Sequence, residues 1–233
     1  MSEIRKAVVL FSGGLDSSTL LARAVGDYGR EYVVALRVFF GQKHVKEVES
    51  AKAVAARYGV KQRFLDLTEV FADSDCSLLS GSANDIPKQT YAAQLDESRS
   101  PLVSTYVPFR NGLFLSCAAS VALSLGCDVV MYGAHHDDWA DDAYPDCSLD
   151  FVEAMRQSIE VGSGHQLTLE APFVTWTKAD IVKLGLELGV PFELTWSCYE
   201  GGDRPCGQCA TCLDRQAAFE ANSEVDPLLS REV

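Results

Sequence analysis

The chain has 233 residues, of which 47% are hydrophobic, and its 20 Lys and Arg residues against 33 Asp and Glu residues give a formal net charge of −13. This length and apolar content suffice for one well-buried domain with a small appendage. No apolar run is long enough to span a membrane and the N-terminus lacks a signal-peptide pattern, so we expect a cytoplasmic protein with no membrane partner. Nucleic-acid binding usually needs a basic face, so the acidic balance argues against an RNA or DNA partner.

The first third of the chain alternates short apolar runs with helical patterns. The run at residues 32–40 is almost continuously apolar, which is typical of a strand covered by helices on both faces. Glycines at the ends of the helical patterns, Gly29 and Gly59, are expected to stop both helices. We predict strands at residues 7–10, 32–40 and 64–67, and helices at residues 17–28 and 45–58. This alternation predicts a parallel βαβαβ arrangement.

A long polar stretch interrupts the pattern. Periodicity fails from residue 68 to residue 105, where we expect a functional flap or a mobile loop. Thr177 followed three residues later by Asp180 indicates a capping box. We predict a strand at residues 128–133, an acid-rich loop at 134–148, and helices at residues 112–125, 151–161 and 177–188. The chain is therefore expected to be α/β, with an open, mostly parallel, doubly wound sheet and helices on both faces.

A glycine-rich loop follows the first strand, where residues 12–18 read Ser-Gly-Gly-Leu-Asp-Ser-Ser. Glycines let the backbone approach an anion, and the following helix aims free N–H groups at the same point. No Lys follows the glycines, which excludes the phosphoryl-transfer loop, and the dinucleotide-binding pattern is absent too. The loop resembles the pyrophosphate loop (PP-loop) of the ATP pyrophosphatases, which cleave ATP between its α- and β-phosphates and adenylate an oxygen atom. A plain glycine turn with a serine cap is the simpler alternative.

Four of the eight cysteines crowd the C-terminal fifth of the chain, in the spacing Cys-x7-Cys-x2-Cys-x2-Cys. Two-residue spacers let neighbouring thiolates converge on one ion, and four thiolates describe a closed structural zinc site. An iron–sulfur cluster is the alternative. The predicted ligands of one structural Zn²⁺ are Cys198, Cys206, Cys209 and Cys212. We expect this metal to fix a C-terminal segment, residues 191–233, against a PP-loop domain formed by residues 1–190.

Further segments appear in a specific order along the chain. They are Gly-Gln-Lys-His at 41–44, Thr-Tyr-Val-Pro-Phe-Arg-Asn at 105–111, Tyr-Pro-Asp-Cys at 144–147 and Leu-Thr-Trp-Ser-Cys-Tyr at 194–199. Together with the PP-loop and the four cysteines, they resemble the 7-cyano-7-deazaguanine synthase family of queuosine biosynthesis over nearly the whole chain. The resemblance implies conversion of 7-carboxy-7-deazaguanine and ammonia into a nitrile through an adenylated acid and an adenylated amide. Mg-ATP would be split to AMP and pyrophosphate, twice for each nitrile.

The resemblance and the residue types together predict the site. ATP would be held by Phe11, Ser12, Gly13, Gly14, Leu15, Asp16, Ser17 and Ser18, with Val38 and Phe39 at the adenine. The predicted catalytic residues are Asp16, Arg110 and Lys178: Asp16 orients the loop or approaches Mg²⁺, and the two cations meet phosphate or the substrate carboxylate. The predicted substrate-binding residues are Gln42, His44, Arg110, Asn111 and Asp146, with Asp146 reading adjacent N–H donors of the base.

Simpler interpretations stay open for these residues. Asp16 is also explained as an acid in the first turn of a helix, Arg110 as a surface ion pair and Lys178 as a solvated side chain. Val38 and Phe39 are equally explained as core residues. The run of His and Asp at residues 135–138 suits a second metal, but we interpret it as a solvated loop.

Alternative functions come from the same superfamily or from a different class. An amide-forming synthetase and a tRNA thiolase both adenylate their substrates, but we expect neither an RNA-binding nor a glutaminase domain in this acidic chain. We therefore expect free ammonia as the nitrogen donor. A non-catalytic nucleotide-binding protein would bind ATP without turnover. By analogy with other small synthetases, we expect a homodimer.

Overall fold

The computed structural model describes residues 5–97, 102–140 and 143–229. Its centre is a five-stranded sheet in the order β3-β2-β1-β4-β5, with every neighbouring pair parallel. The strands are β1 (Ala7–Leu10), β2 (Val33–Phe39), β3 (Lys61–Asp66), β4 (Val129–Met131) and β5 (Thr168–Glu170). The chain runs outward from β1 to β3 and then crosses to β4 on the other side of β1. Ligands of open α/β sheets bind at such a reversal, beyond the carboxyl ends of the strands.

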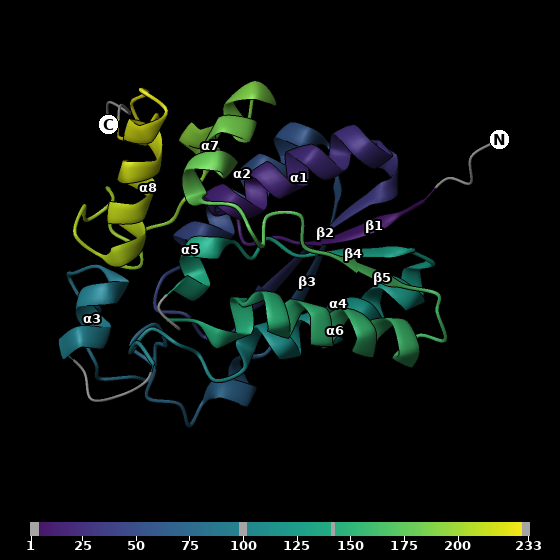
Figure 1. The fold of residues 1–233 in the computed structure, drawn as a ribbon, viewed down its shortest axis with the longest axis horizontal. Helices are drawn as coiled ribbons and strands as arrows, with labels where there is room; N and C mark the ends of the chain where they lie inside the picture. Colours follow the sequence, from purple (N-terminus) through teal and green to yellow (C-terminus); the bar gives the residue numbers. More distant parts are fainter. Residues whose placement is uncertain (1–4, 98–101, 141–142, 230–233) are drawn as a thin grey trace.

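Helices cover both faces of the sheet, as Figure 1 shows. Along β1, Ala7 and Val9 share a core with α1, α2 and α7, whereas Val8 and Leu10 share a second core with α4 and α6. Alternate residues of a strand point to opposite faces, so an apolar run buried on both faces needs helices on both. The long helices are α1 (Leu15–Tyr28), α2 (Lys46–Tyr58), α4 (Arg110–Leu125), α6 (Leu149–Gly162), α7 (Lys178–Glu187) and α8 (Ala210–Ala221). The predicted doubly wound α/β fold is confirmed.

Local signals for helix ends are also confirmed. The Thr177 hydroxyl accepts the N–H of Asp180 at 3.2 Å, and the Asp180 carboxylate accepts the N–H of Thr177 at 3.0 Å, which completes the capping box of α7. Gly29 (φ 87°) and Gly59 (φ 66°) end α1 and α2 in conformations that favour glycine.

Strand β5 and helices α3 (Tyr91–Glu97), α5 (His136–Trp139) and α8 were missing from the sequence prediction. Strand β5 has only three residues, too few for a periodic signal, and it forms because it pairs with β4. Helix α8 begins directly after Cys209 and contains Cys212, so the polar and glycine-rich cysteine segment concealed its start. The expected loop at 68–105 contains the short helix α3, and the acid-rich loop contains α5. Asp141 and Asp142 of that loop lie outside the described residues.

The C-terminal segment packs tightly on the sheet domain. Ala218 and Phe219 of α8 belong to the same core as α1 and α7, and the ring of Phe219 meets that of Phe192 at 5.2 Å. A buried ion pair between Arg215 and Asp226, 2.7 Å apart, ties the end of the chain to α8. These contacts fix the cysteine segment next to the carboxyl edge of the sheet. The division of the chain at residue 190 stays a prediction.

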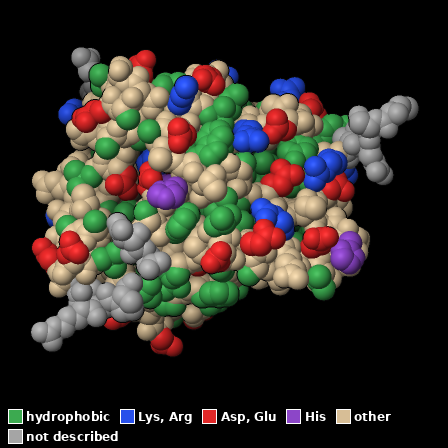
Figure 2. Space-filling view, in the orientation of Figure 1, with side chains coloured by type: hydrophobic (Ala, Val, Ile, Leu, Met, Phe, Trp, Pro, Cys, Tyr) green, Lys and Arg blue, Asp and Glu red, His purple; other side chains and the backbone are tan. Residues whose placement is uncertain are grey.

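The surface in Figure 2 carries acidic and basic side chains interspersed with small apolar groups. In the parts of the chain that the structure describes, no helix combines the length and apolarity needed to cross a bilayer.

Candidate active site

The PP-loop is held in shape by close contact with α2. A Cβ atom added at Gly13 (φ +93°) would lie 2.4 Å from the backbone nitrogen of Ala51 and 2.7 Å from the carbonyl oxygen of Glu47, so this position requires glycine. The N–H groups of Ser12 and Gly13 both donate to the Ser17 hydroxyl at 3.3 Å. These donors converge above the start of α1, where phosphate oxygens can replace the hydroxyl as acceptors.

A cavity of about 250 Å³ opens beside this loop at the carboxyl edge of the sheet. The structure brings most of the predicted site residues to its wall: Phe11, Ser12, Gly14, Leu15, Asp16, Ser17, Val38, Gln42, His44, Arg110, Asn111 and Lys178. One cavity therefore collects side chains from the PP-loop, from the end of β2 and from the starts of α4 and α7.

Four predicted residues lie outside this wall: Gly13, Ser18, Phe39 and Asp146. Ser18 is fully buried in α1, and Phe40, not Phe39, faces the cavity. Asp146 is only 4% exposed, and its carboxylate accepts the backbone N–H of Asn111 at 3.0 Å. Asp146 therefore holds the start of α4 from behind the cavity wall.

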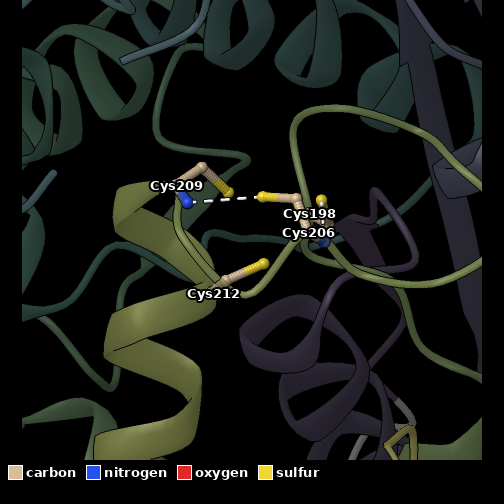
Figure 3. Close-up of side chains that lie close together, drawn as sticks. All are labelled: Cys198, Cys206, Cys209 and Cys212. Carbon is tan, nitrogen blue, oxygen red and sulfur yellow. Dashed lines mark hydrogen bonds between the residues drawn. The ribbon is translucent and has the colours of Figure 1, made fainter. Parts of the chain in front are cut away.

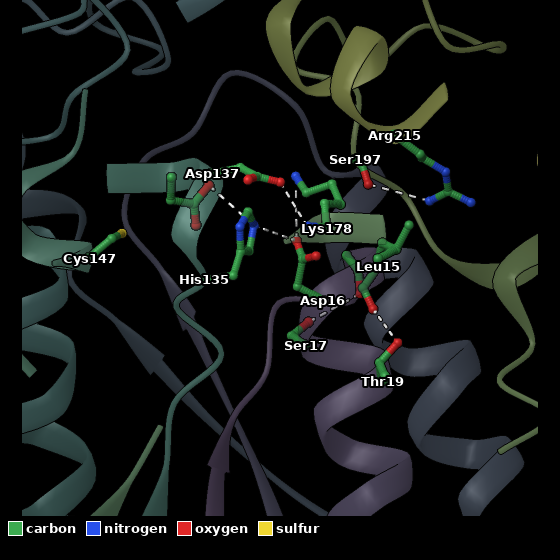
Figure 4. Close-up of polar contacts among 12 residues, drawn as sticks. Leu15, Asp16, Ser17, Thr19, His135, Asp137, Cys147, Lys178, Ser197 and Arg215 are labelled. Carbon is green, nitrogen blue, oxygen red and sulfur yellow. Dashed lines mark hydrogen bonds and ion pairs between the residues drawn. The ribbon is translucent and has the colours of Figure 1, made fainter. Parts of the chain in front are cut away.

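Asp16 is the centre of a charged cluster, shown in Figure 4. Its carboxylate lies 3.8 Å from Lys178 Nζ and 3.6 Å from His135 Nε2, and His135 Nε2 also lies 3.3 Å from Asp138 Oδ1. Burial alone would raise the pKa of Asp16, but the charges of Lys178 and His135 outweigh it and hold this pKa well below its ordinary value. Asp16 is therefore ionised throughout the neutral range.

Lys178 is a nearly buried cation, with its side chain 8% exposed. Burial works against its charge, but nearby carboxylates, led by Asp16, hold the pKa of Lys178 above its ordinary value. Its backbone N–H donates to Asp137 at 2.7 Å, which ties the start of α7 to the acid-rich loop. The arrangement keeps a fixed positive charge at the cavity wall.

Arg110 supplies the second fixed cation. Its guanidinium lies 5.1 Å from the ring centre of Phe40 and 5.9 Å from that of Phe114. Burial opposes its charge, but the Asp146 carboxylate holds the pKa of Arg110 above its ordinary value. A planar guanidinium held in this way suits a phosphate or a carboxylate.

The interpretation of residues 135–138 as a solvated loop missed two contributors to this cluster. His135 is 1% exposed and contacts the PP-loop aspartate, and Asp138 lines the cavity. The sequence did indicate these two residues, because they follow directly after the predicted strand at residues 128–133. The carboxyl end of that parallel strand lies at the same edge as the PP-loop. The side chains of Tyr91, Tyr144 and Tyr199 also line the cavity and were not predicted from the sequence.

Replacing His135 with Gln is expected to destabilise the fold by about 1–3 kcal/mol at pH 6, because a buried positive charge that pairs with two carboxylates is lost. Burial would lower the pKa of His135, but Asp138 and Asp16 raise it above 6.5. A histidine whose pKa is higher in the folded than in the unfolded protein stabilises the fold at pH values below its unfolded-state pKa. This stabilisation is lost as the pH rises through its folded-state pKa. The difference in melting temperature between the wild type and His135→Gln should therefore decrease from pH 6 to pH 9.

The matched control for this prediction is His136→Gln, because the neighbouring His136 is 46% exposed and its side chain pairs with Asp137 at the surface. This control should show a small difference at both pH values. A His135→Gln difference that does not depend on pH would contradict the charged role.

The four C-terminal cysteines converge as predicted, with sulfur atoms within 4.8 Å of one another (Figure 3). The backbone N–H groups of Glu200 and Cys206 donate to the Cys198 sulfur at 3.4 and 3.3 Å. Hydrogen bonds from Cys209 and Cys212 lower the pKa of the Cys198 thiol. Four convergent sulfurs supported by N–H donors fit a tetrahedral metal ion.

Comparisons with known proteins identify the family of this chain. Residues 6–223 match the family model described as "Queuosine biosynthesis protein QueC". The "7-cyano-7-deazaguanine synthase" of Archaeoglobus fulgidus is 47% identical over 228 residues, which cover 97% of this chain and 91% of that protein. The protein of the same name from Caldicellulosiruptor saccharolyticus is 43% identical over 96% of this chain and 94% of its own.

A solved structure shows the same fold at low identity. The NMN synthetase from Francisella tularensis superposes with a TM-score of 0.52 at 15% identity, covering 95% of this chain and 78% of that one. The family match over almost the whole chain is more specific than this likeness of fold. The chain belongs to the QueC family of queuosine biosynthesis proteins.

Proposed function

We propose that this protein converts 7-carboxy-7-deazaguanine, ammonia and ATP into 7-cyano-7-deazaguanine, with AMP and pyrophosphate as the other products. The observation that carries the proposal is one cavity that combines the PP-loop donors with the fixed cations Lys178 and Arg110, in a chain of the QueC family. Relatives at 43–47% identity are named for this product.

The chemistry explains why an adenylating site is needed. Making a nitrile from a carboxylate removes two oxygen atoms, and neither oxygen is a good leaving group. When the carboxylate attacks the α-phosphorus, pyrophosphate leaves, and ammonia then displaces AMP to give the amide. Adenylation of the amide oxygen and loss of a second AMP give the nitrile. Each of the two oxygen atoms is removed after one adenylation, so two ATP are used for each nitrile. One site serves both adenylations.

Different residues at the cavity wall have different roles in these steps. The loop donors at Ser12 and Gly13 hold the departing pyrophosphate, and Asp16 fixes Lys178 next to them. Arg110 holds the α-phosphate or the substrate carboxylate. Fixed positive charges are most effective where negative charge develops in the transition state. For Asp146, which lies behind the wall, we propose that it holds Arg110 and the start of α4, and reads the base only if it moves into the cavity.

The implied ions have separate roles. Mg²⁺, held with ATP near Asp16, would offset the negative charge of the phosphates. Zn²⁺ at Cys198, Cys206, Cys209 and Cys212 would be structural, because four protein ligands leave no open position for chemistry. We also propose that the protein works as a homodimer in the cytoplasm, where thiols remain reduced and available to the metal.

The proposal is tested with purified protein, Mg-ATP, ammonium and 7-carboxy-7-deazaguanine, with the products followed by mass spectrometry. We expect the nitrile together with AMP and pyrophosphate. Cleavage to ADP and phosphate would contradict the adenylating chemistry, and ATP binding without turnover would indicate a nucleotide-binding protein instead.

A further inference from the structure

Glu47 is an acidic residue at the cavity wall to which neither the motifs nor the proposed function gives a role. It lies in the first turn of α2 and lines the cavity together with Ser12, Ser17 and Arg110. Its backbone carbonyl oxygen packs against Gly13, as the 2.7 Å approach to a Cβ atom there shows. The tight packing of α2 on the PP-loop therefore fixes Glu47 next to the place where ATP would be cleaved.

The neighbouring acid of the same helix turn behaves differently. Glu49 has a side chain that is 65% exposed, pairs with Lys46 at 3.9 Å and does not line the cavity. Glu47, by contrast, forms no ion pair or hydrogen bond through its carboxylate within the described residues. An acid that faces a ligand cavity and lacks a partner there is free to act on what enters the cavity.

The surroundings set the protonation of Glu47. The other charged or titratable side chains at the cavity wall are Asp16, Arg37, His44, Tyr91, Arg110, Tyr132, Asp138, Tyr144, Cys147, Lys178 and Tyr199. Burial raises the pKa of Glu47 to about 7, and of these side chains it is Arg110 whose charge opposes the rise. A group that titrates near neutral pH can both accept and release a proton during turnover.

The proposed reaction has protons to remove from nitrogen in both of its halves. Ammonium must lose a proton before its nitrogen can attack the acyl-adenylate. Later, the adenylated amide must lose its N–H proton as the C–O bond to AMP breaks. Asp16 and Lys178, which pair with each other at the cavity wall, have fixed charges and are poorly suited to this exchange.

We propose, on the basis of the proposed function, that Glu47 is the acid–base residue that takes protons from nitrogen in this cavity. In the first half, ammonium gives a proton to the Glu47 carboxylate. The freed lone pair forms the C–N bond, AMP leaves with the electron pair of the C–O bond, and the new C–NH₃⁺ group loses one further proton to water to give the neutral amide. In the second half, adenylation of the amide oxygen gives a protonated imidate, which loses one N–H proton to water. The remaining N–H proton of the neutral imidate then passes to Glu47. The N–H electron pair completes the nitrile triple bond, and AMP again leaves with the electrons of the C–O bond. Glu47 returns each proton to water.

The test separates activation of the acid from proton transfer. Exchange of labelled pyrophosphate into ATP, driven by 7-carboxy-7-deazaguanine without ammonium, reports only the first adenylation. Glu47→Gln should keep this exchange within a few-fold of the wild type, which also shows that the variant is folded. Formation of the nitrile from the acid, and from the corresponding carboxamide, should fall by about 10²- to 10⁴-fold. Glu49→Gln is the matched control and should match the wild type in every assay.

The pH dependence gives a second measurement. In the wild type, kcat/KM for nitrile formation should rise with pH around a pKa of about 7, and Glu47→Gln should lack this rise. Loss of the exchange reaction in Glu47→Gln, or nitrile formation at the wild-type rate, would overturn the role of Glu47. If the wild type itself shows no exchange driven by the acid, the proposed function is wrong, and the role of Glu47 is wrong with it.

Discussion

Replacing Lys178 with Met is expected to slow pyrophosphate exchange driven by 7-carboxy-7-deazaguanine by about 10²- to 10³-fold, the usual effect of removing one group that stabilises developing charge. Lys178 is nearly buried at the cavity wall, and Asp16 lies 3.8 Å from its ammonium group. Met keeps most of the length and apolar volume of the side chain but removes the charge. Asp16 then keeps its ion pair with His135, 3.6 Å away, and the cavity wall loses one positive charge that would attract ATP.

Lys183 provides the matched control for this change. It lies on the same helix, α7, and its side chain is exposed. Lys183→Met should therefore leave exchange unchanged. If Lys178→Met kept the wild-type exchange rate while binding ATP, Lys178 would be a structural partner of Asp16 and not a catalytic cation.

Removing the metal from the four-cysteine site is expected to destabilise the fold strongly. Structural zinc contributes on the order of 10 kcal/mol to the folding of small peptides at neutral pH. The loss on chelation, or in Cys209→Ser, should therefore exceed the ~1 kcal/mol of an average substitution. The effect should also reach the cavity. Cys198 follows Trp196 and precedes Tyr199, which both line it, and Gly201 packs directly against His44.

The measurement is the melting temperature before and after chelation, together with the zinc content of the purified protein. Cys117→Ser is the control, because Cys117 lies on α4 away from the cluster and is half-buried. An equal melting temperature for metal-free and metal-loaded protein would contradict a structural role. Iron with inorganic sulfide in place of zinc would identify a cluster instead.

The fold was predictable from the sequence wherever the signal was local. Helix stops at Gly29 and Gly59 and the capping box of Thr177 depend on a few neighbouring residues, and the structure confirms all three. Strand β5 was not predictable in this way, because three residues carry no period and the strand exists through its pairing with β4. Helix α8 was missed because glycines and cysteines around the metal site dominate the composition just before it.

In the site, too, residues in local sequence motifs were predicted, whereas residues that depend on tertiary contacts were not. The PP-loop and the four cysteines are contiguous patterns, and the structure places them as the sequence predicts. His135 was assigned to a solvated loop because its sequence neighbours are acidic. Folding brings Asp16 and Lys178, from distant segments, around it and buries it. Glu47 was passed over because a glutamate in a helix is ordinary until the structure shows that it faces the cavity with no ionic partner among the described residues.

The most direct test of the account follows the two oxygen atoms of the substrate carboxylate. With 7-carboxy-7-deazaguanine labelled by ¹⁸O at both carboxylate positions, the protein should release two AMP molecules for each nitrile, and each AMP should carry one ¹⁸O atom. This result would show that the acid oxygen and the amide oxygen both attack the α-phosphorus. Label recovered in inorganic phosphate, with ADP as the other product, would contradict adenylation as the central step.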